Sequence, residues 1–317
     1  MIDRAAAPAA SDGDRRRHLL RLGGSTGVVA GIALDHRDSL RVVLERDGIA
    51  GQSPDGLREL KLRLTRVLAP VATAIMLDAE LGGRALAAGA VPPAVGLVMP
   101  LEAQGYEAGG DERLTTLLDD FAPADARRLG ADACKVFLPY RADDDEQAAR
   151  QDELVRSTAA ACHAIGLPLV VEPVPYRRST ESPADFDGAW ERLVIGAVAR
   201  LRPFGIDLFK LPFPVPDLAA AAETRALDGC RALDDACGGI PWVLLGAGAQ
   251  TETFLEQVRL AGTAGASGFL AGRGIWGPAL AADPDEAERR ATEVSLPAFH
   301  SCRAVAERSC RPLPTPR

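Results

Sequence analysis

The sequence predicts an α/β protein built as a (β/α)8 barrel, and three features of its 317 residues support this fold class. Eight short segments bounded by turn residues are near-continuously apolar, as parallel strands buried on both faces are. Polar or amphipathic stretches with helical spacing lie between them, so strand and helix alternate over roughly 250 residues. The first apolar segment is followed by Asp35-His36-Arg37 and not by the glycine-rich turn of a doubly wound sheet, which disfavours that rival architecture.

The apolar segments are the expected strands, and the stretches with helical spacing are the expected helices. The clearest helices are expected over residues 146–165, 190–202, 218–236 and 251–264. The strands are expected over residues 28–34, 72–77, 95–99, 133–138, 167–174, 206–211, 242–245 and 268–271.

We expect one barrel domain over residues 26–300 with a short extension at each end. Residues 1–25 hold the basic stretch Arg15-Arg16-Arg17-His18-Leu19-Leu20-Arg21-Leu22, which predicts a leading helix that covers the bottom of the barrel. A single basic helix face in an acidic protein is usually solvated and indicates no partner. Residues 301–317 are expected to form a tail, and its proline-rich end from Cys310 onward is expected to be loose.

The charge balance and composition exclude several classes of function. The chain has 36 basic and 44 acidic residues, and the resulting net charge of −8 disfavours a nucleic-acid partner. The longest apolar stretch, residues 85–101, is interrupted by prolines and glycines, and the apolar run 5–10 is too short for a signal peptide. We therefore expect a cytoplasmic protein with no membrane partner. The six cysteines form no C-x-x-C pair and predict free thiols.

Lysine is rare in this arginine-rich chain, and its few positions indicate chemistry. Only Lys61, Lys135 and Lys210 are lysines, and the last two lie in apolar segments. Unlike arginine, lysine can lose its proton near neutral pH and form a Schiff base. Burial and a neighbouring cation such as Lys135 both favour the neutral, nucleophilic amine of Lys210. The alternative is that Lys210 forms a structural ion pair with Glu172 or Asp207.

In a barrel of this kind, polar residues at the carboxyl ends of the strands face the mouth of the active site. All but one of the expected strands carry a charge there. Glu172 ends an apolar strand and is a candidate general acid–base, with a scaffolding role as the alternative. Asp35 is a candidate for orienting the amine or a substrate hydroxyl. Asp78, Glu80 and Glu102 stay open between substrate contacts and salt bridges. His36 and Arg37 are candidates for substrate binding, and Gln104 and Tyr176 are further polar residues at these ends.

The last two strands end in small residues that let backbone N–H groups approach an anion. Gly246-Ala247-Gly248 follows the seventh strand, and Gly272-Arg273-Gly274 follows the eighth. These loops are the usual phosphate site of this fold, and the guanidinium of Arg273 suits phosphate or sulfonate oxygens. The alternative is that the glycines serve turn geometry alone.

A metal centre is not expected. Zinc would need several converging histidines, and His36 alone lies at the end of an expected strand. A magnesium site made by Asp78, Glu80 and Glu102 stays open, although no other feature of the sequence requires it.

Several motifs, in order from about residue 28 to 285, resemble the class I aldolase family that includes tagatose 1,6-bisphosphate aldolase and sulfofructosephosphate aldolase. The matching motifs are Ala33-Leu34-Asp35-His36-Arg37, Leu77-Asp78-Ala79-Glu80-Leu81-Gly82, Glu102-Ala103-Gln104-Gly105-Tyr106, Cys134-Lys135-Val136, Glu172-Pro173, Leu208-Phe209-Lys210-Leu211-Pro212, Leu245-Gly246-Ala247-Gly248 and Gly272-Arg273-Gly274-Ile275-Trp276.

The resemblance implies a Schiff base on Lys210, proton transfer by Glu172, support from Lys135 and Asp35, and an anion held by Arg273 and the turn Gly246–Gly248. It implies reversible cleavage of a tagatose- or fructose-1,6-bisphosphate-like ketose to dihydroxyacetone phosphate and an aldehyde, with neither metal nor organic cofactor. The expected partner is thus a phosphorylated sugar, and the outer helices leave room for a homodimer or larger oligomer.

Two departures from the family pattern lie near the expected anion and bear on the identity of the substrate. Where the family usually reads Asp-Gln-Arg this chain has Asp35-His36-Arg37, and where it usually has a serine this chain has Gly246 or Ala247. The alternatives that stay open are an aldolase for a sulfonated or deoxy ketose phosphate, a transaldolase-like enzyme, and a non-catalytic sugar-phosphate-binding protein.

Overall fold

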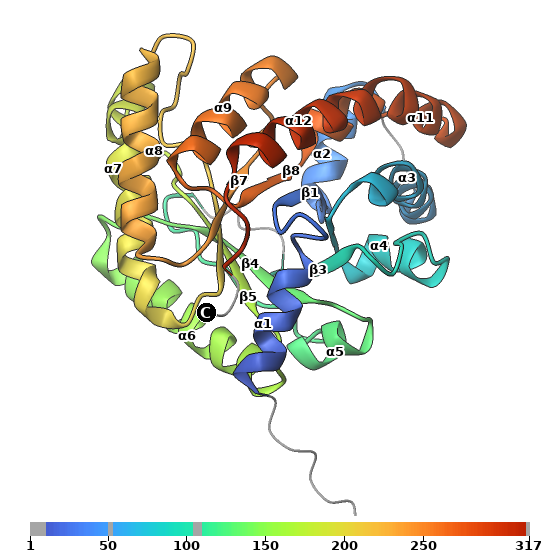
Figure 1. Cartoon of the computed structure of the whole chain (residues 1–317), viewed down its shortest axis with the longest axis horizontal. Coiled ribbons are helices and arrows are strands. Elements are labelled where there is room, and N and C mark those ends of the chain that lie inside the picture. The colour runs from blue at the N-terminus through green and yellow to red at the C-terminus, as the bar shows by residue number, and fades with distance from the viewer. Residues whose placement is uncertain (1–10, 50–52, 104–109, 315–317) are drawn as a thin grey trace, which may run out of the picture.

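A computed structural model describes residues 11–49, 53–103 and 110–314 of the chain. Parallel strands pair in chain order and close into a barrel, which confirms the predicted fold class (Figure 1). Each strand begins and ends within two residues of its predicted bounds. The strands are β1 (Val29–Leu34), β2 (Ala74–Leu77), β3 (Gly96–Pro100), β4 (Ala133–Pro139), β5 (Leu169–Val174), β6 (Leu208–Leu211), β7 (Trp242–Leu245) and β8 (Gly268–Ala271).

Helices surround the barrel in Figure 1, and the predicted helices are present, the one over residues 251–264 with its predicted bounds and the others with shifted ends. The helix predicted from residue 190 begins at Pro183, because Ser182 and Asp185 form a reciprocal capping box. The helices are α1 (Asp12–Arg21), α2 (Asp38–Arg46), α3 (Pro54–Leu68), α4 (Ala79–Ala87), α5 (Pro123–Arg128), α6 (Asp145–Ala164), α7 (Pro183–Leu201), α8 (Glu223–Cys237), α9 (Thr251–Ala264), α10 (Arg273–Trp276), α11 (Pro284–Arg290) and α12 (Leu296–Ser309), with short turns η1 (Ala69–Val71), η3 (Arg202–Phe204), η4 (Gly277–Ala279) and η5 (Ala291–Ser295). No helix in the described part of the chain is long and apolar enough to cross a membrane.

Strand alternation decides which side chains enter the barrel. Val170 and Leu208 belong to the interior cluster, whereas the residues that follow them, Val171 and Phe209, pack outward in the cluster between strands and helices. Because side chains alternate along a strand, Glu172 on β5 and Lys210 on β6 face inward again, one step nearer the carboxyl ends. The barrel interior is therefore apolar toward the amino ends of the strands and charged toward their carboxyl ends.

Helix α1 closes the amino end of the barrel, where the sequence predicts a covering helix. Leu19 and Leu22 pack into the interior cluster. At one end of the helix Arg15 pairs with Asp207 at 3.0 Å. At the other, Arg21 pairs with Asp132 at 2.7 Å.

Removing the charge of Asp132 is expected to lower the free energy of unfolding by about 2 kcal/mol. Its carboxylate is buried and also accepts hydrogen bonds from His18 and the Leu97 amide, so Asp132→Asn turns an amide NH2 toward one of these donors. Urea denaturation measures the change. The control Asp228→Asn removes an exposed i,i+3 partner of Arg231 and should change stability by less than about 0.5 kcal/mol. Equal values for the two variants would contradict the anchoring role of Asp132.

The sequence analysis expected a tail over residues 301–317, but the described part of this segment is folded. Helix α12 runs through residue 300, and the residues after it return to the bottom of the barrel. The Leu313 amide donates to the Gly27 carbonyl at 2.8 Å, and the Leu313 side chain is buried in the interior cluster. The segment after Cys310, which its prolines predict to be loose, is therefore held in place by the burial of Leu313 and by a backbone hydrogen bond to Gly27.

Candidate active site

A cavity of about 300 Å³ opens at the carboxyl ends of the strands. Most of the residues that the sequence analysis singled out line it, and they come from every strand except β2. The lining consists of Ala33, Asp35, His36, Ser39, Glu102, Lys135, Phe137, Glu172, Val174, Lys210, Leu245, Ala247, Gly248, Gly272 and Arg273.

Lys210 is 2% exposed and lies beside Glu172, with 2.9 Å between its Nζ and the carboxylate Oε1. Of the two partners that the sequence left open for it, Asp207 is excluded. Asp207 precedes β6 at the amino end, where it contacts His163 and Arg15. The contact with Glu172 joins a candidate nucleophile to a group that can take its proton.

Lys135 connects Glu172 to two further carboxylates. Its Nζ lies 2.9 Å from Asp35 Oδ2, 2.6 Å from Glu102 Oε1 and 3.1 Å from Glu172 Oε2. All four side chains are buried, so water screens these charges little. Glu172 is thus held between two ammonium groups, with Lys135 on one oxygen and Lys210 on the other.

The carboxylates of this cluster differ in their proton affinity. Burial favours the neutral form of Asp35, but Lys135 and Lys210 outweigh it and hold its pKa below the usual value. Burial raises the pKa of Glu102, and the Asp35 charge adds to this while Lys135 opposes it. Asp35 therefore stays ionised, and Glu102 is the carboxyl group more readily protonated.

His36 is a neutral side chain at the β8 side of the cavity. Burial lowers its pKa to about 3, against the attraction of the Asp35 carboxylate and with the help of the Arg273 cation. Its ring meets Trp276 edge to face with centroids 5.1 Å apart, and the indole of Trp276 donates to the Ala33 carbonyl at 2.8 Å. The tryptophan fixes the ring beside the cavity.

The turns after β7 and β8 lie together, as the sequence predicts. Ala247 has φ 45°, a left-handed conformation that is rare without glycine and that often marks a functional turn. A Cβ on Gly274 would lie 2.3 Å from the Ala249 carbonyl oxygen, so only glycine lets the two turns approach this closely. Arg273 is exposed and has no acidic partner within the described ranges.

Several predicted site residues lie outside the cavity lining. Asp78 caps α4 by accepting from the Leu81 amide and pairs with Lys61, the third lysine, in a fully buried contact. Glu80 is 55% exposed, so it does not join Asp78 and Glu102 in a magnesium site. The residues 11–49, 53–103 and 110–314 contain no group of three His, Cys, Asp or Glu side chains arranged to hold a metal ion.

Three more of the predicted site residues do not line the cavity. Arg37 is buried and donates to the Glu102 carbonyl, and Gly246 lies behind the turn against Ala271. Tyr176 points its hydroxyl to the Asp111 carbonyl at 2.8 Å. Gln104 lies outside the described residues.

Sequence reasoning missed the apolar part of the lining and one hydroxyl group. Phe137, Val174 and Leu245 are half-buried at the mouth, and Ser39 lies in the first turn of α2. The period of two along each strand could have found the first two, since Phe137 follows Lys135 and Val174 follows Glu172 at that spacing. No charge or motif marks Ser39.

A single protein-family model matches almost the whole barrel. The model of the family described as "DeoC/LacD family aldolase" matches residues 30–277. The cavity and all the strands except the first residue of β1 lie inside this range.

The chain is also similar to curated proteins and to solved structures that are named as aldolases. The chain is 28% identical over 276 residues to a tagatose 1,6-diphosphate aldolase 1 of Streptococcus pyogenes, covering 82% of this chain and 84% of that protein. It is 28% identical over 292 residues to a tagatose 1,6-diphosphate aldolase 2 of Streptococcus mutans, with coverages of 87% and 88%. A solved Schiff-base-forming fructose-1,6-bisphosphate aldolase matches with a TM-score of 0.64 at 18% identity, covering 92% of this chain and 98% of that one. At that identity the structural match supports the fold alone.

Proposed function

We propose, from the premise that this chain belongs to the DeoC/LacD family of aldolases, that it is a class I enzyme acting through an imine on Lys210. The reaction is the reversible retro-aldol cleavage of a phosphorylated ketose to dihydroxyacetone phosphate and an aldehyde. The observation that carries the proposal is the buried contact of 2.9 Å between Lys210 Nζ and Glu172 Oε1. The names of the bacterial relatives, which specify a ketose diphosphate, support the substrate class.

Imine formation begins with transfer of a proton from Lys210 to Glu172. The free amine attacks the C2 ketone, a bond forms between Nζ and C2, and the π electrons of the carbonyl move to its oxygen, which takes a proton from the nitrogen to become a hydroxyl group. Glu172 returns the proton to the departing hydroxyl group, and water leaves to give the protonated imine. Lys135 and Asp35 keep Glu172 in place during these transfers, because Lys135 holds both carboxylates.

Carbon–carbon cleavage uses the same carboxylate. Glu172 accepts the proton of the C4 hydroxyl, the C3–C4 bond breaks, and its electron pair moves into the imine to form an enamine. The aldehyde leaves, the enamine takes a proton at C3, and water hydrolyses the imine to release dihydroxyacetone phosphate. The imine accepts the electron pair of the broken bond, so the reaction proceeds with the substrate, the side chains and water.

The phosphate of the substrate is held at the β7 and β8 turns. Arg273 offers a planar fork of donors and has no competing carboxylate in the described ranges. Ala247, Gly248 and Gly272 line the cavity beside it with little side chain to obstruct an anion. His36 adds a neutral ring to this end of the cavity.

Borohydride trapping tests the proposal. The protein is incubated with dihydroxyacetone phosphate and sodium borohydride, with and without EDTA, and its peptides are analysed by mass spectrometry. We expect a stable adduct on the peptide that contains Lys210, formed equally in both samples. No adduct under conditions that modify a known class I aldolase would contradict the proposal and favour a binding protein or a metal-assisted enzyme.

A further inference from the structure

The charges around the mouth of the cavity bear on which phosphorylated ketose enters it. A ketose bisphosphate carries an anion at each end and needs two cationic subsites, one on either side of the reactive lysine. The basic residues that follow each strand, up to the first residue of the next helix, are few, and residues 104–109, which the structure does not describe, include none. They are Arg37 after β1, Arg113 after β3, Arg141 after β4, Arg177 and Arg178 after β5, and Arg273 after β8.

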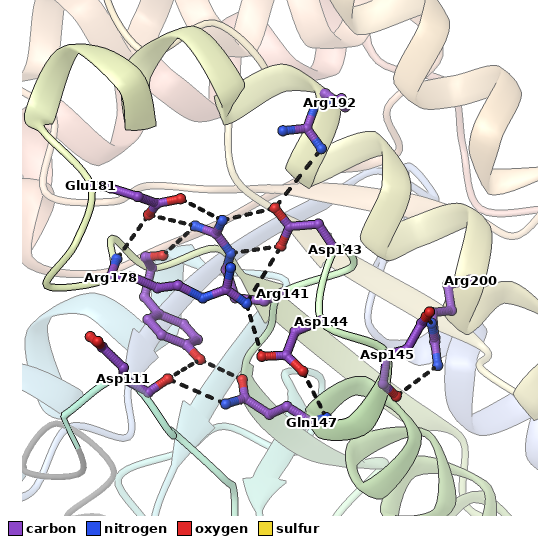
Figure 2. A network of polar contacts seen from close by, with 11 residues as sticks. Asp111, Arg141, Asp143, Asp144, Asp145, Gln147, Arg178, Glu181, Arg192 and Arg200 are labelled. Atoms are coloured by element: carbon purple, nitrogen blue, oxygen red, sulfur yellow. Dashed lines mark hydrogen bonds and ion pairs between the residues drawn. The ribbon is translucent and has the colours of Figure 1, made fainter.

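On the β4–β5 side, the arginines are already engaged with the protein. Arg141 is buried, and its guanidinium pairs with Asp143 at 2.9 Å and Glu181 at 2.7 Å (Figure 2). Arg178 pairs with Asp144 at 2.8 Å, and its amide donates to Glu181. Neither arginine lines the cavity.

The remaining basic residues are also turned to other contacts. Arg177 donates to the Glu181 carbonyl at 2.7 Å. Arg113 lies over the ring of Tyr176, 4.9 Å from its centroid. Arg37 is buried below the mouth and does not line the cavity. Of these basic residues in the described ranges, Arg273 is therefore the only one that lines the cavity.

At the β4–β5 rim, the part of the mouth formed by the residues that follow β4 and β5, carboxylates outnumber guanidinium groups in one hollow. A second hollow beside the network of Figure 2 is lined by four carboxylates and two guanidinium groups. Inside the cavity, the lining on this side adds the apolar side chains of Phe137 and Val174. In the described ranges, no arginine of this rim lines the cavity, so the lining on this side offers a second phosphate no arginine, and the carboxylates of the hollow disfavour it. The hollow is lined by Asp111, Glu112, Asp144, Glu146, Gln147, Arg150 and Arg178.

We infer that the substrate is a ketose 1-phosphate, with its single phosphate at Arg273 and an uncharged aldehyde portion toward the β4–β5 rim. The inference rests on the proposed function and narrows its substrate class. The products are then dihydroxyacetone phosphate and an aldehyde without a phosphate. The asymmetry of the mouth carries the assignment: Arg273 lines the cavity on the β8 side, whereas the arginines on the β4–β5 side contact carboxylates, a backbone carbonyl or a ring outside the lining.

The direct test compares kcat/KM for D-fructose 1-phosphate and D-tagatose 1-phosphate with kcat/KM for the corresponding 1,6-bisphosphates. We expect the better monophosphate to exceed its bisphosphate by at least about tenfold. A bisphosphate that is cleaved as well as or better than its monophosphate would overturn the inference. Borohydride trapping of dihydroxyacetone phosphate, run alongside, separates this result from failure of the proposed function, because it probes Lys210 without a second phosphate.

A charge variant tests the role of the rim. Asp144→Asn removes one negative charge and releases Arg178, while asparagine still caps α6 as Asp144 does. We expect the preference for the monophosphate to fall at least threefold at low ionic strength and to fall less in high salt. The matched control is Asp145→Asn, the next residue, which is 96% exposed and pairs with Arg200 and not with Arg141 or Arg178 (Figure 2). An unchanged preference in Asp144→Asn, or an equal change in both variants, would overturn the electrostatic basis of the inference.

Discussion

Replacing Lys210 by methionine will reduce kcat by roughly 10⁴- to 10⁶-fold, the range expected when the nucleophile of a group that acts as a unit is removed. Methionine has a similar length and is apolar, but it cannot form the bond to C2 through which the electron pair of the cleaved bond is accepted. The variant will also form no borohydride adduct with dihydroxyacetone phosphate. Steady-state cleavage assays and peptide mass spectrometry measure the two effects.

The fold should survive this replacement. Glu172 also lies 3.1 Å from Lys135, so its buried carboxylate still has a cationic partner when Lys210 is replaced. The sheet hydrogen bonds of β6 involve only its backbone. Circular dichroism and thermal unfolding provide the control. A folded variant that retains more than about 1% of the wild-type kcat, or an adduct on another lysine, would contradict the assignment of the nucleophile.

Replacing Glu172 by glutamine will lower kcat by about 10²- to 10⁴-fold, the usual contribution of general acid–base catalysis. Glutamine keeps the size of the side chain and can still contact Lys135, but it cannot accept the C4 hydroxyl proton. KM should change much less, because the phosphate contacts at Arg273 lie on the other side of the cavity. Stopped assays over a range of ketose phosphate concentrations separate the two constants.

The same variant should still form the imine, though more slowly, because Lys210 remains present. This outcome distinguishes Glu172→Gln from Lys210→Met in a trapping experiment. The matched control is Glu80→Gln, another glutamate just after a strand but 55% exposed and outside the cavity. If both glutamine variants lost activity to the same degree, or if Glu172→Gln stayed fully active, proton transfer by Glu172 would be refuted.

Most of the barrel could be predicted because its strands are buried on both faces. A continuous apolar run such as residues 242–245 has one interpretation within an alternating pattern, and β7 has those bounds. Helix ends were harder, since they depend on particular side-chain caps. Asp217 accepts from the Ala219 and Ala220 amides, and the resulting turn delays α8 to Glu223, five residues after the predicted start.

The site was predictable where a charge interrupts an apolar strand and harder to predict elsewhere. Lys135, Glu172 and Lys210 meet because their side chains enter the barrel from the adjacent strands β4, β5 and β6. Asp78 carries a similar signal, yet it caps α4 and neutralises Lys61, a lysine whose helical position gave no indication of a partner. A carboxylate at the end of a strand can face the barrel or begin the next helix, and spacing alone does not distinguish the two.

The contacts at the bottom of the barrel set an order for folding. Arg15 in α1 pairs with Asp207, and the Gly27 carbonyl accepts from the Leu313 amide, so these contacts join segments made early with segments made late. During synthesis at about 5–20 residues per second, α1 must wait roughly ten seconds or more before Asp207 exists. Closure of the ring requires β8 to reach β1, where Gly268 pairs with Val29, the first residue of the first strand. Contacts of such long sequence separation predict slow folding with populated intermediates.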